Sequence, residues 1–303
     1  MALLYTQELS LIEEELLKHL DPEVRYVFEV GNYILSSGGK RIRPLLTLLT
    51  CKVLGGKEEI ALPLAVGIEY VHVASLLHDD VVDNAQTRRG KKSANLVFGE
   101  KACVLTGDYM YAKALSLYSE YGSIESIRVL SDAVMKMSQG QVLELINLGK
   151  LIDEETYFKV IDYKTGALFG ACLAVGALCA NRTDYWRFYS VGIKLGRAFQ
   201  LIDDALDYVG DEKKLGKPAG NDLREGKCTY PLISLLDKLS QKELKLFYEK
   251  PEELRKTVVE LGGVERTKQR ARQELQEVIN FFEGLEGSDA LRELFFSVVE
   301  REA

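Results

Sequence analysis

The chain has 303 residues, of which 47% are hydrophobic and 28% charged, and its formal net charge is −7. This charge argues against a general nucleic-acid-binding protein, which would carry a basic surface. The length fits one large domain or two ordinary ones. The five cysteines are an odd number, widely spaced and without a CxxC pair, which favours reduced thiols and argues against a zinc site.

The sequence predicts a nearly all-α protein. Helix-favouring residues at helical spacing run from end to end, and the chain has 6 prolines. No linker or change of composition marks a boundary, so we expect a single domain over residues 1–303. Met1 to Glu8 lack the basic start and apolar core of a signal peptide, and the apolar run from Ala167 to Ala180 is too short to span a bilayer. We therefore expect a cytoplasmic protein.

Glycines and capping residues divide the chain into helices. Asp21 followed by Pro22 is typical of an N-cap and the first position of a helix, and glycine pairs are typical of helix ends. A polar loop is expected over 84–93 and a glycine-rich charged loop over 210–229. The expected helices cover residues 5–20, 22–37, 45–54, 60–82, 99–121, 123–148, 153–180 and 183–209, and shorter helices follow from 230 to 303, with breaks near Ser240, Pro251 and Gly262.

Two acidic clusters lie at the ends of the helices expected over 60–82 and 183–209. In each cluster, carboxylates interrupt an apolar run at positions i, i+1 and i+4, so the first and third are one turn apart and repel each other. A single acidic triplet is most often a solvated helix end, but two triplets set among Leu, Ile and Val need a cation. Mg²⁺ commonly binds one or two carboxylates together with substrate phosphates. We expect the two clusters to form two sides of one Mg²⁺-diphosphate site; they comprise Asp79, Asp80 and Asp83, and Asp203, Asp204 and Asp207.

Basic residues flank both clusters. A short basic run alone is more often a solvated surface, but seven cations suffice for two diphosphate groups, one bound through metal and one metal-free. His72 lies one or two turns before Asp79, where a lone histidine is ordinarily a core residue. Gly192 and Gly196 share a helical stripe with Asp203, which indicates either close helix packing or an open cavity, and we favour the cavity. The seven cations are Lys40, Arg43, Arg88, Arg89, Lys164, Lys217 and Lys227.

Several motifs together resemble those of the trans-polyprenyl diphosphate synthases, in order over roughly residues 30–232. The resemblance implies an all-α bundle of antiparallel helices around a deep cavity, of the isoprenoid synthase type, and usually a homodimer. The motifs are Gly38-Gly39-Lys40-Arg41-Ile42-Arg43-Pro44, His78-Asp79-Asp80-Val81-Val82-Asp83 with Arg88-Arg89-Gly90, Lys164-Thr165, Gly196 to Asp207 and Gly216-Lys217-Pro218.

The resemblance also implies which residues bind metal and substrates. The expected substrates are isopentenyl diphosphate and an allylic diphosphate, with farnesyl diphosphate favoured. About two or three Mg²⁺ ions are expected on Asp79, Asp83 and Asp203, supported by Asp80, Asp204 and Asp207. The allylic diphosphate is assigned to Arg88, Lys164 and Lys217, the isopentenyl diphosphate pocket to Lys40, Arg43, His72 and Arg89, and the steadying of the allylic cation to Thr165 and Gln200.

Product length is expected to depend on residues just before the first acidic cluster. In the family, a bulky aromatic residue four or five positions before this motif keeps products short, whereas this chain has Ala74 and Ser75. Ser75 lies on the acidic face by rotation, while the case for Ala74 rests on the resemblance. Small residues at both positions imply a product beyond C20, with octaprenyl favoured and Met135 as a candidate floor of the cavity.

Other interpretations of the protein's function stay open. A geranylgeranyl or other medium-chain synthase is the first alternative, and a non-catalytic subunit of a heteromeric synthase is the second. A class I terpene cyclase is disfavoured because its second metal motif carries Asn, Ser and Glu. Gln141 and Glu144 have residue types exchanged relative to many family members, so their roles stay open. The resemblance also leaves open a peripheral membrane contact during release of a long apolar product.

Overall fold

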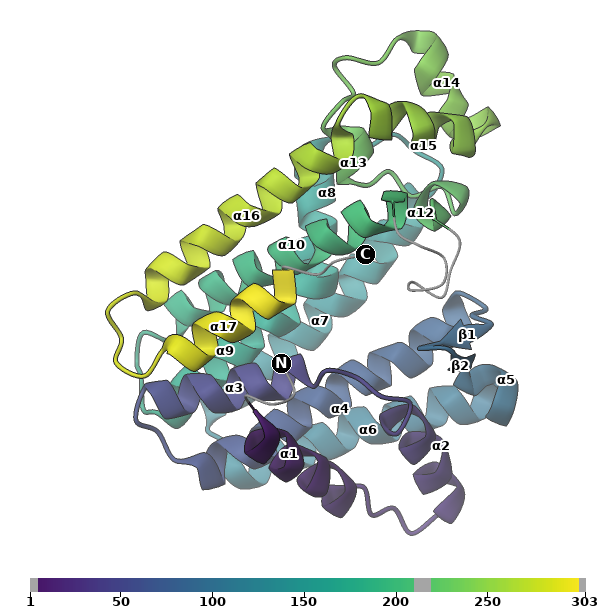
Figure 1. Cartoon of the computed structure of the whole chain (residues 1–303). Helices are drawn as coiled ribbons and strands as arrows, with labels where there is room; N and C mark the ends of the chain where they lie inside the picture. Colours follow the sequence, from purple (N-terminus) through teal and green to yellow (C-terminus); the bar gives the residue numbers. More distant parts are fainter. Residues whose placement is uncertain (1–4, 210–218, 300–303) are drawn as a thin grey trace. The chain divides into compact units, whose positions relative to one another are not determined.

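In the computed structural model of the chain, residues 5–209 and 219–299 are described, and they form helices almost throughout. The all-α class predicted from composition is therefore confirmed. The helices, labelled in Figure 1, are α1 Thr6–His19, α2 Arg25–Leu35, α3 Ile42–Val53, α4 Glu58–Val82, α5 Ala94–Phe98, α6 Glu100–Tyr121, α7 Ile124–Asn147, α8 Glu154–Ile161, the π-helical turn η1 Asp162–Gly166, α9 Ala167–Cys179, α10 Tyr185–Val209, α12 Asn221–Arg224, α13 Tyr230–Ile233, α14 Gln241–Glu249, α15 Pro251–Glu260, α16 Gly263–Phe282 and α17 Asp289–Val299.

The polar loop expected over 84–93 contains the one sheet among the described residues. Strands β1, Thr87–Arg88, and β2, Lys91–Lys92, pair antiparallel, with Thr87 opposite Lys92. Helix α5 follows directly and was not expected from the sequence. The five cysteines are free and buried, as expected for small apolar side chains.

The prediction that α2 begins at Pro22 is wrong. The helix begins at Arg25, and its N-cap residue is Val24, which makes no side-chain capping bond. Asp21 instead accepts a hydrogen bond from Lys113 Nζ at 2.7 Å. A contact with a residue distant in sequence therefore replaces the local cap, because the carboxylate finds a charged donor there.

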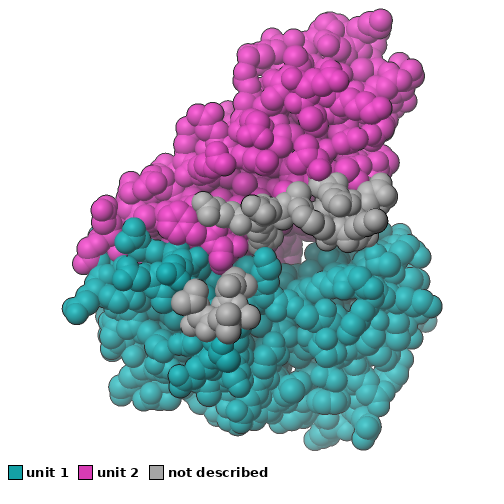
Figure 2. Space-filling model, in the orientation of Figure 1, with its two compact units in different colours: residues 1–132, 171–189, 285–294 teal, residues 133–170, 190–284, 295–303 magenta. Residues whose placement is uncertain are grey.

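The described residues cluster into two compact units, coloured separately in Figure 2. The first is drawn from 1–132, 171–189 and 285–294, and the second from 133–170, 190–284 and 295–303. The single domain expected over residues 1–303 stays a prediction.

The first unit is built on α4, which packs against α3 and α6. Two helical segments, Glu58–Val82 and Glu154–Cys179, are long and apolar enough to cross a membrane, but their apolar windows are 72% and 83% buried. Such burial is typical of the core helices of soluble proteins, where a helix that is apolar all round lies inside the fold.

Close helix packing, rather than a cavity, explains the glycines of α10. A Cβ at Gly192 would lie 2.5 Å from the carbonyl oxygen of Phe169, and a Cβ at Gly196 would lie 2.6 Å from Cα of Gly166. The cavity that we favoured at these two positions is therefore wrong. Gly140 has the same role in α7, where a Cβ would lie 2.5 Å from the backbone nitrogen of Lys164.

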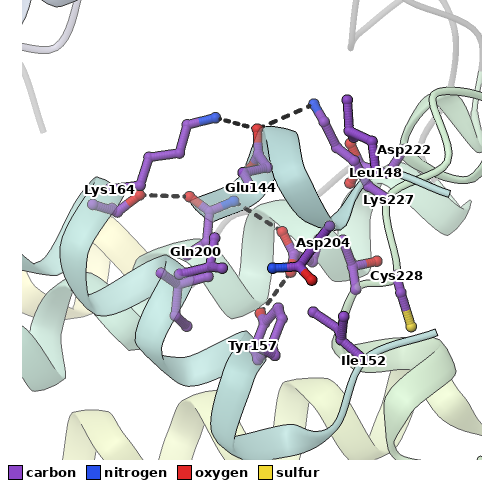
Figure 3. A pocket seen from close by; sticks show the side chains of 15 residues that line it. Glu144, Leu148, Ile152, Tyr157, Lys164, Gln200, Asp204, Asp222, Lys227 and Cys228 are labelled. Atoms are coloured by element: carbon purple, nitrogen blue, oxygen red, sulfur yellow. Dashed lines mark hydrogen bonds and ion pairs between the residues drawn. The ribbon is translucent and has the colours of Figure 1, made fainter. Parts of the chain in front are cut away.

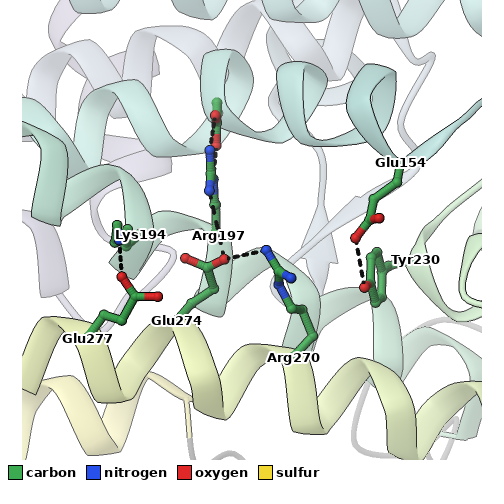
Figure 4. Close-up of polar contacts among 8 residues, drawn as sticks. Glu154, Lys194, Arg197, Tyr230, Arg270, Glu274 and Glu277 are labelled. Atoms are coloured by element: carbon green, nitrogen blue, oxygen red, sulfur yellow. Dashed lines mark hydrogen bonds and ion pairs between the residues drawn. The ribbon is translucent and has the colours of Figure 1, made fainter.

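Ion pairs fasten α16 to the helices beside it in the second unit (Figure 4). Arg197 of α10 donates from Nε to Asp162 at 2.5 Å and lies 3.7 Å from Glu274 of α16. Lys194 pairs with Glu277 in the same way. These contacts hold α10, which carries the second acidic cluster, against its neighbours.

Candidate active site

The first acidic cluster lies at the C-terminal end of α4, and its carboxylates point in different directions. Asp79 is partly exposed and Asp83, the C-cap residue, is exposed. Asp80 is 0% exposed, and its Oδ1 accepts a hydrogen bond from Arg88 Nε at 2.9 Å. Asp80 therefore fixes the guanidinium of Arg88, one of the predicted diphosphate-binding groups, while Asp79 and Asp83 lie one turn apart at the surface.

Arg43, His72 and Arg89, three residues of the predicted isopentenyl diphosphate pocket, lie together in the first unit. Arg43 Nη1 is 3.3 Å from His72 Nε2, and Arg89 Nη1 donates to the carbonyl oxygen of Gly38. Burial and the nearby arginines, Arg43 first, hold the pKa of His72 well below its ordinary value, so the imidazole is neutral at pH 7. Burial and neighbouring guanidinium groups also lower the pKa of Arg89. Concentrated positive charge of this kind binds an anion such as a diphosphate.

The backbone conformation of the loop before this pocket favours a glycine at position 39. Gly39 has φ +147°, and a Cβ there would lie 2.9 Å from Arg89 Nη1. A larger residue would be strained at this φ and would displace the Arg89 guanidinium. Lys40, the fourth predicted member of the pocket, is exposed next to this glycine.

Arg41 belongs to the same basic run but has a structural role. Its side chain is 2% exposed and donates to Glu69 Oε1 at 3.0 Å, to Glu13 Oε1 at 2.7 Å and to the carbonyl oxygen of Leu35 at 2.7 Å. This network ties α3 to α1, α2 and α4. Sequence alone does not separate Arg41 from its functional neighbours, because the run reads as one basic cluster.

The predicted chain-length residues differ in exposure. Ala74 is fully buried, whereas Ser75 is partly exposed and its Oγ donates to the carbonyl oxygen of His72 at 2.7 Å. This agrees with the rotation that puts Ser75, and not Ala74, on the acidic face of α4. Met135 belongs to the second unit, on α7, and is 54% exposed.

The second acidic cluster is divided in the same way as the first. Asp203 is partly exposed, while Asp204 is 3% exposed and accepts hydrogen bonds from Tyr157 Oη at 2.6 Å and Gln200 Nε2 at 2.8 Å. Burial raises the pKa of Asp204 to about 7, against the opposing effect of these two hydrogen bonds. Asp207 Oδ2 accepts from the backbone N–H of Asp222 at 3.1 Å, close to the start of α12.

Lys164 and Thr165 lie on the π-helical turn η1, between α8 and α9. Such single turns often occur at functional sites because they displace side chains from the regular helical spacing. Thr165 Oγ1 donates to Gln200 Oε1 at 2.9 Å. The two residues expected to steady the allylic cation are therefore in direct contact.

A pocket of about 130 Å³ lies in the second unit beside these residues (Figure 3). Lys164 Nζ donates to Glu144 at 2.6 Å, and Lys227 Nζ lies 3.9 Å from the same carboxylate. Burial lowers the pKa of Lys227, but Glu144, Asp222 and Glu225 more than offset it, so the pKa is raised and the ammonium stays charged. Glu144, whose role was open, therefore holds two of the predicted phosphate-binding lysines.

Two residues that line the pocket were not predicted from the sequence, and the role of Gln141, outside the lining, stays open. Tyr157 carries no signal in the sequence, and Asp222 was only one charge of an expected loop, yet both line the pocket. Gln141 Nε2 is buried and has no hydrogen-bond partner among the described residues. Lys217, predicted to bind the allylic diphosphate, lies outside the described residues.

The donor set suits a hard divalent cation. In the first unit, Asp79 is partly exposed and Asp83 is exposed, and in the second unit Asp203 is partly exposed, whereas Asp80 and Asp204 are buried and accept hydrogen bonds from Arg88 and Tyr157. Among the described residues, no group of three or more His, Cys, Asp or Glu side chains could hold a metal ion. Mg²⁺ fits each cluster taken by itself, because it keeps several waters and takes few protein carboxylates, completing its shell with substrate phosphate.

Comparison with known proteins identifies the family. The polyprenyl synthetase family model matches residues 24–261. The chain is 37% identical to octaprenyl diphosphate synthase of Escherichia coli strain K12 over 294 residues, covering 91% of this chain and 89% of that protein. It is 36% identical to a short chain isoprenyl diphosphate synthase of Methanocaldococcus jannaschii over 247 residues, covering 80% and 75%.

A solved structure extends the similarity to the fold. The polyprenyl synthase of Caulobacter crescentus CB15, crystallised with calcium and isoprenyl diphosphate, superposes with a TM-score of 0.92 at 31% identity, covering 100% of this chain and 97% of that one. The chain therefore belongs to the polyprenyl synthetase family and is a prenyltransferase of isoprenoid diphosphates.

Proposed function

We propose that the protein condenses isopentenyl diphosphate head to tail onto an allylic diphosphate, with farnesyl diphosphate favoured, and makes a long-chain all-trans polyprenyl diphosphate. The observation that carries this proposal is the presence of two separate cationic clusters. Arg43 and Arg89, beside the neutral imidazole of His72, form one, and Lys164 and Lys227 around Glu144 form the other. Two diphosphates need two such sites.

Different residues bind the metal and hold the departing diphosphate in the proposed reaction. When bound, Mg²⁺ on Asp79, Asp83 and Asp203 supplies charge that stabilises the departing diphosphate. Arg88 and Lys164 hold that diphosphate as its C–O bond breaks and it leaves with the electron pair. The allylic carbocation that remains is attacked by the double bond of isopentenyl diphosphate, which forms the new C–C bond, and the released diphosphate takes up the proton that is lost.

Thr165 and Gln200 act on the cation rather than on the diphosphate. Their side-chain oxygens carry partial negative charge, and Thr165 is buried. Preorganised dipoles stabilise developing positive charge most where water is excluded. No side-chain nucleophile is required.

We further propose a product beyond C20, with octaprenyl favoured. The small side chains of Ala74 and Ser75 support this, since neither fills space below the first acidic cluster. Overall identity does not decide product length, because the octaprenyl and short-chain relatives are almost equally similar.

A Ser75→Tyr variant tests whether the side chain at position 75 limits product length. Because Ser75 is partly exposed on the acidic face of α4, a tyrosine should be tolerated there and should shorten the products. Ala74→Tyr is the comparison, and it should mainly destabilise the protein, because Ala74 is fully buried and overpacking costs about 1–3 kcal/mol. Product lengths are read by chromatography, and unchanged lengths in Ser75→Tyr would remove this position as the gate.

We also propose a cytoplasmic homodimer. Helix α6 exposes Val104, Leu105 and Leu115, and large apolar side chains gathered on one helix support a protein contact. Sedimentation of the purified protein tests this proposal, and a monomer at micromolar concentration would contradict it.

The activity itself is tested with purified protein, Mg²⁺, farnesyl diphosphate and labelled isopentenyl diphosphate. Extended prenyl chains are expected, chelation of the metal should abolish them, and added Mg²⁺ should restore them. Asp83→Asn should lose most activity, whereas Asp289→Asn, which changes an exposed carboxylate on α17, should not. No incorporation by the folded wild-type protein would contradict the proposal.

A further inference from the structure

A chain of three hydrogen bonds runs through the interior of the second unit. Thr165 Oγ1 donates to Gln200 Oε1 at 2.9 Å, Gln200 Nε2 donates to Asp204 Oδ1 at 2.8 Å, and Tyr157 Oη donates to Asp204 Oδ2 at 2.6 Å. Figure 3 shows Gln200, Asp204 and Tyr157 along this line. Tyr157 and Asp204 are each 3% exposed, so water does not compete for these groups.

This chain fixes the orientation of the Gln200 amide. Both oxygens of Asp204 accept hydrogen bonds here, Oδ1 from Gln200 and Oδ2 from Tyr157, so in its ionised form Asp204 attracts the NH₂ group and repels the carbonyl oxygen. The carbonyl oxygen of Gln200 must then lie on the side of Thr165. A rotated amide would place two acceptors against each other at Asp204, which costs free energy in a buried site.

We propose that Tyr157 is a positioning residue for the reaction. It holds Asp204, and Asp204 in turn aims the carbonyl oxygen of Gln200 at the developing allylic cation. This inference rests on the proposed function, in which Gln200 and Thr165 face that cation. It also gives Asp204 a task distinct from metal binding, because both of its oxygens already accept hydrogen bonds from protein groups.

The packing around Tyr157 provides a matched control. Tyr230 lies with its ring centroid 5.6 Å from that of Tyr157, and both rings contact Phe158. The hydroxyl of Tyr230 donates to Glu154 at 3.0 Å and takes no part in the chain to Gln200 (Figure 4). Tyr230→Phe therefore removes a hydroxyl from the same aromatic cluster without touching the amide.

The test compares Tyr157→Phe with Tyr230→Phe in steady-state assays with farnesyl and isopentenyl diphosphates. Tyr157→Phe should lower kcat roughly tenfold, because it removes one of the two side-chain hydrogen bonds that orient the Asp204 carboxyl group. The KM for isopentenyl diphosphate should stay within about twofold, because Arg43, His72 and Arg89 form that pocket. Tyr230→Phe should leave kcat unchanged. Equal kcat values for the two variants would overturn the inference.

A double variant separates positioning from general stability. Thr165→Val releases the other end of the Gln200 amide, so either single change already lets the amide rotate. The kcat of Thr165→Val with Tyr157→Phe should therefore fall by clearly less than the product of the two single losses. If the losses multiply, Tyr157 does not act through Gln200.

If Tyr157→Phe does not fold, Asp204→Asn replaces it in the test. This variant should show the same loss of kcat with an unchanged KM for isopentenyl diphosphate, and a wild-type kcat would contradict the inference.

Failure of the proposed function and failure of the inference can be told apart. If the wild-type protein itself makes no prenyl chains, the proposed function fails, and the inference fails with it. If the wild type is active and Tyr157→Phe is as active as Tyr230→Phe, only the inference fails.

Discussion

Replacing Arg41 by methionine should destabilise the protein strongly. The guanidinium is 2% exposed and pairs with Glu69, which is 3% exposed, at 3.0 Å. Without Arg41, the Glu69 carboxylate is left buried without its charged partner, and removing one member of a buried pair costs about 3–5 kcal/mol. Glu13, the other carboxylate partner, is 50% exposed and can turn into water, so it adds little.

This loss is large enough to measure by thermal or urea unfolding. With an unfolding entropy of about 2.1 cal/mol/K per residue, 3–5 kcal/mol lowers the Tm of a 303-residue chain by roughly 5–8 °C. Lys52→Met is the control, because Lys52 forms a partly exposed pair with Glu8 at 3.0 Å, and such pairs contribute at most about 1 kcal/mol.

The double variant Arg41→Met with Glu69→Leu sharpens the test. When both charges of a buried pair are replaced by apolar groups, stability is often recovered. We therefore expect the double variant to be more stable than Arg41→Met alone, and to keep a KM for isopentenyl diphosphate close to that of the wild type. A loss below about 1 kcal/mol in Arg41→Met, or a double variant no more stable than the single one, would refute the reasoning.

Two further predictions follow from the site and from the packing of α10. His72 is neutral at pH 7 because burial and Arg43 lower its pKa. A bound diphosphate raises that pKa again, so isopentenyl diphosphate should bind with proton uptake, and more tightly as the pH falls below about 6.5. Calorimetry in buffers of different ionisation enthalpy should show fewer protons taken up by His72→Gln than by the wild type, and equal uptake would contradict the assignment. Gly192→Ala should cost about 1–3 kcal/mol in the free energy of unfolding, because its Cβ would lie 2.5 Å from the carbonyl oxygen of Phe169; an unchanged urea midpoint would refute it.

Local signals predicted much of the fold. Asp153 caps α8 by accepting from the backbone N–H of Thr156 at 2.8 Å, and Ser240 forms a capping box with Glu243 at the start of α14. The helix start at Asp153 and a break near Ser240 were expected, and both can be found in the sequence because a cap acts within four residues. The start of α2 was predicted wrongly because Asp21 bonds to Lys113, and no local pattern encodes a partner that far away in sequence.

The glycines of α10 show the same limit. Their spacing correctly placed Gly192 and Gly196 on one stripe, but a missing side chain has the same pattern whether it faces a neighbouring helix or an open space. The contacting backbone comes from Gly166 and Phe169, on an earlier helical segment. Only the fold brings these atoms within contact distance, so close packing could not be separated from a cavity by sequence alone.

The two acidic clusters show what helix geometry can decide and what it cannot. Because each residue rotates by about 100°, the second carboxylate of each cluster must point away from the first and third. Asp80 and Asp204 are the buried members, at 0% and 3% exposure. Arg88 was predicted to bind substrate but not to bond Asp80, and Tyr157, the partner of Asp204, lies in another segment and carries no signal in the motif. The buried carboxylate of each cluster therefore orients neighbouring side chains, Asp80 that of Arg88 and Asp204 those of Tyr157 and Gln200, whereas the metal ligands proposed for these clusters are the more exposed carboxylates at the first and third positions.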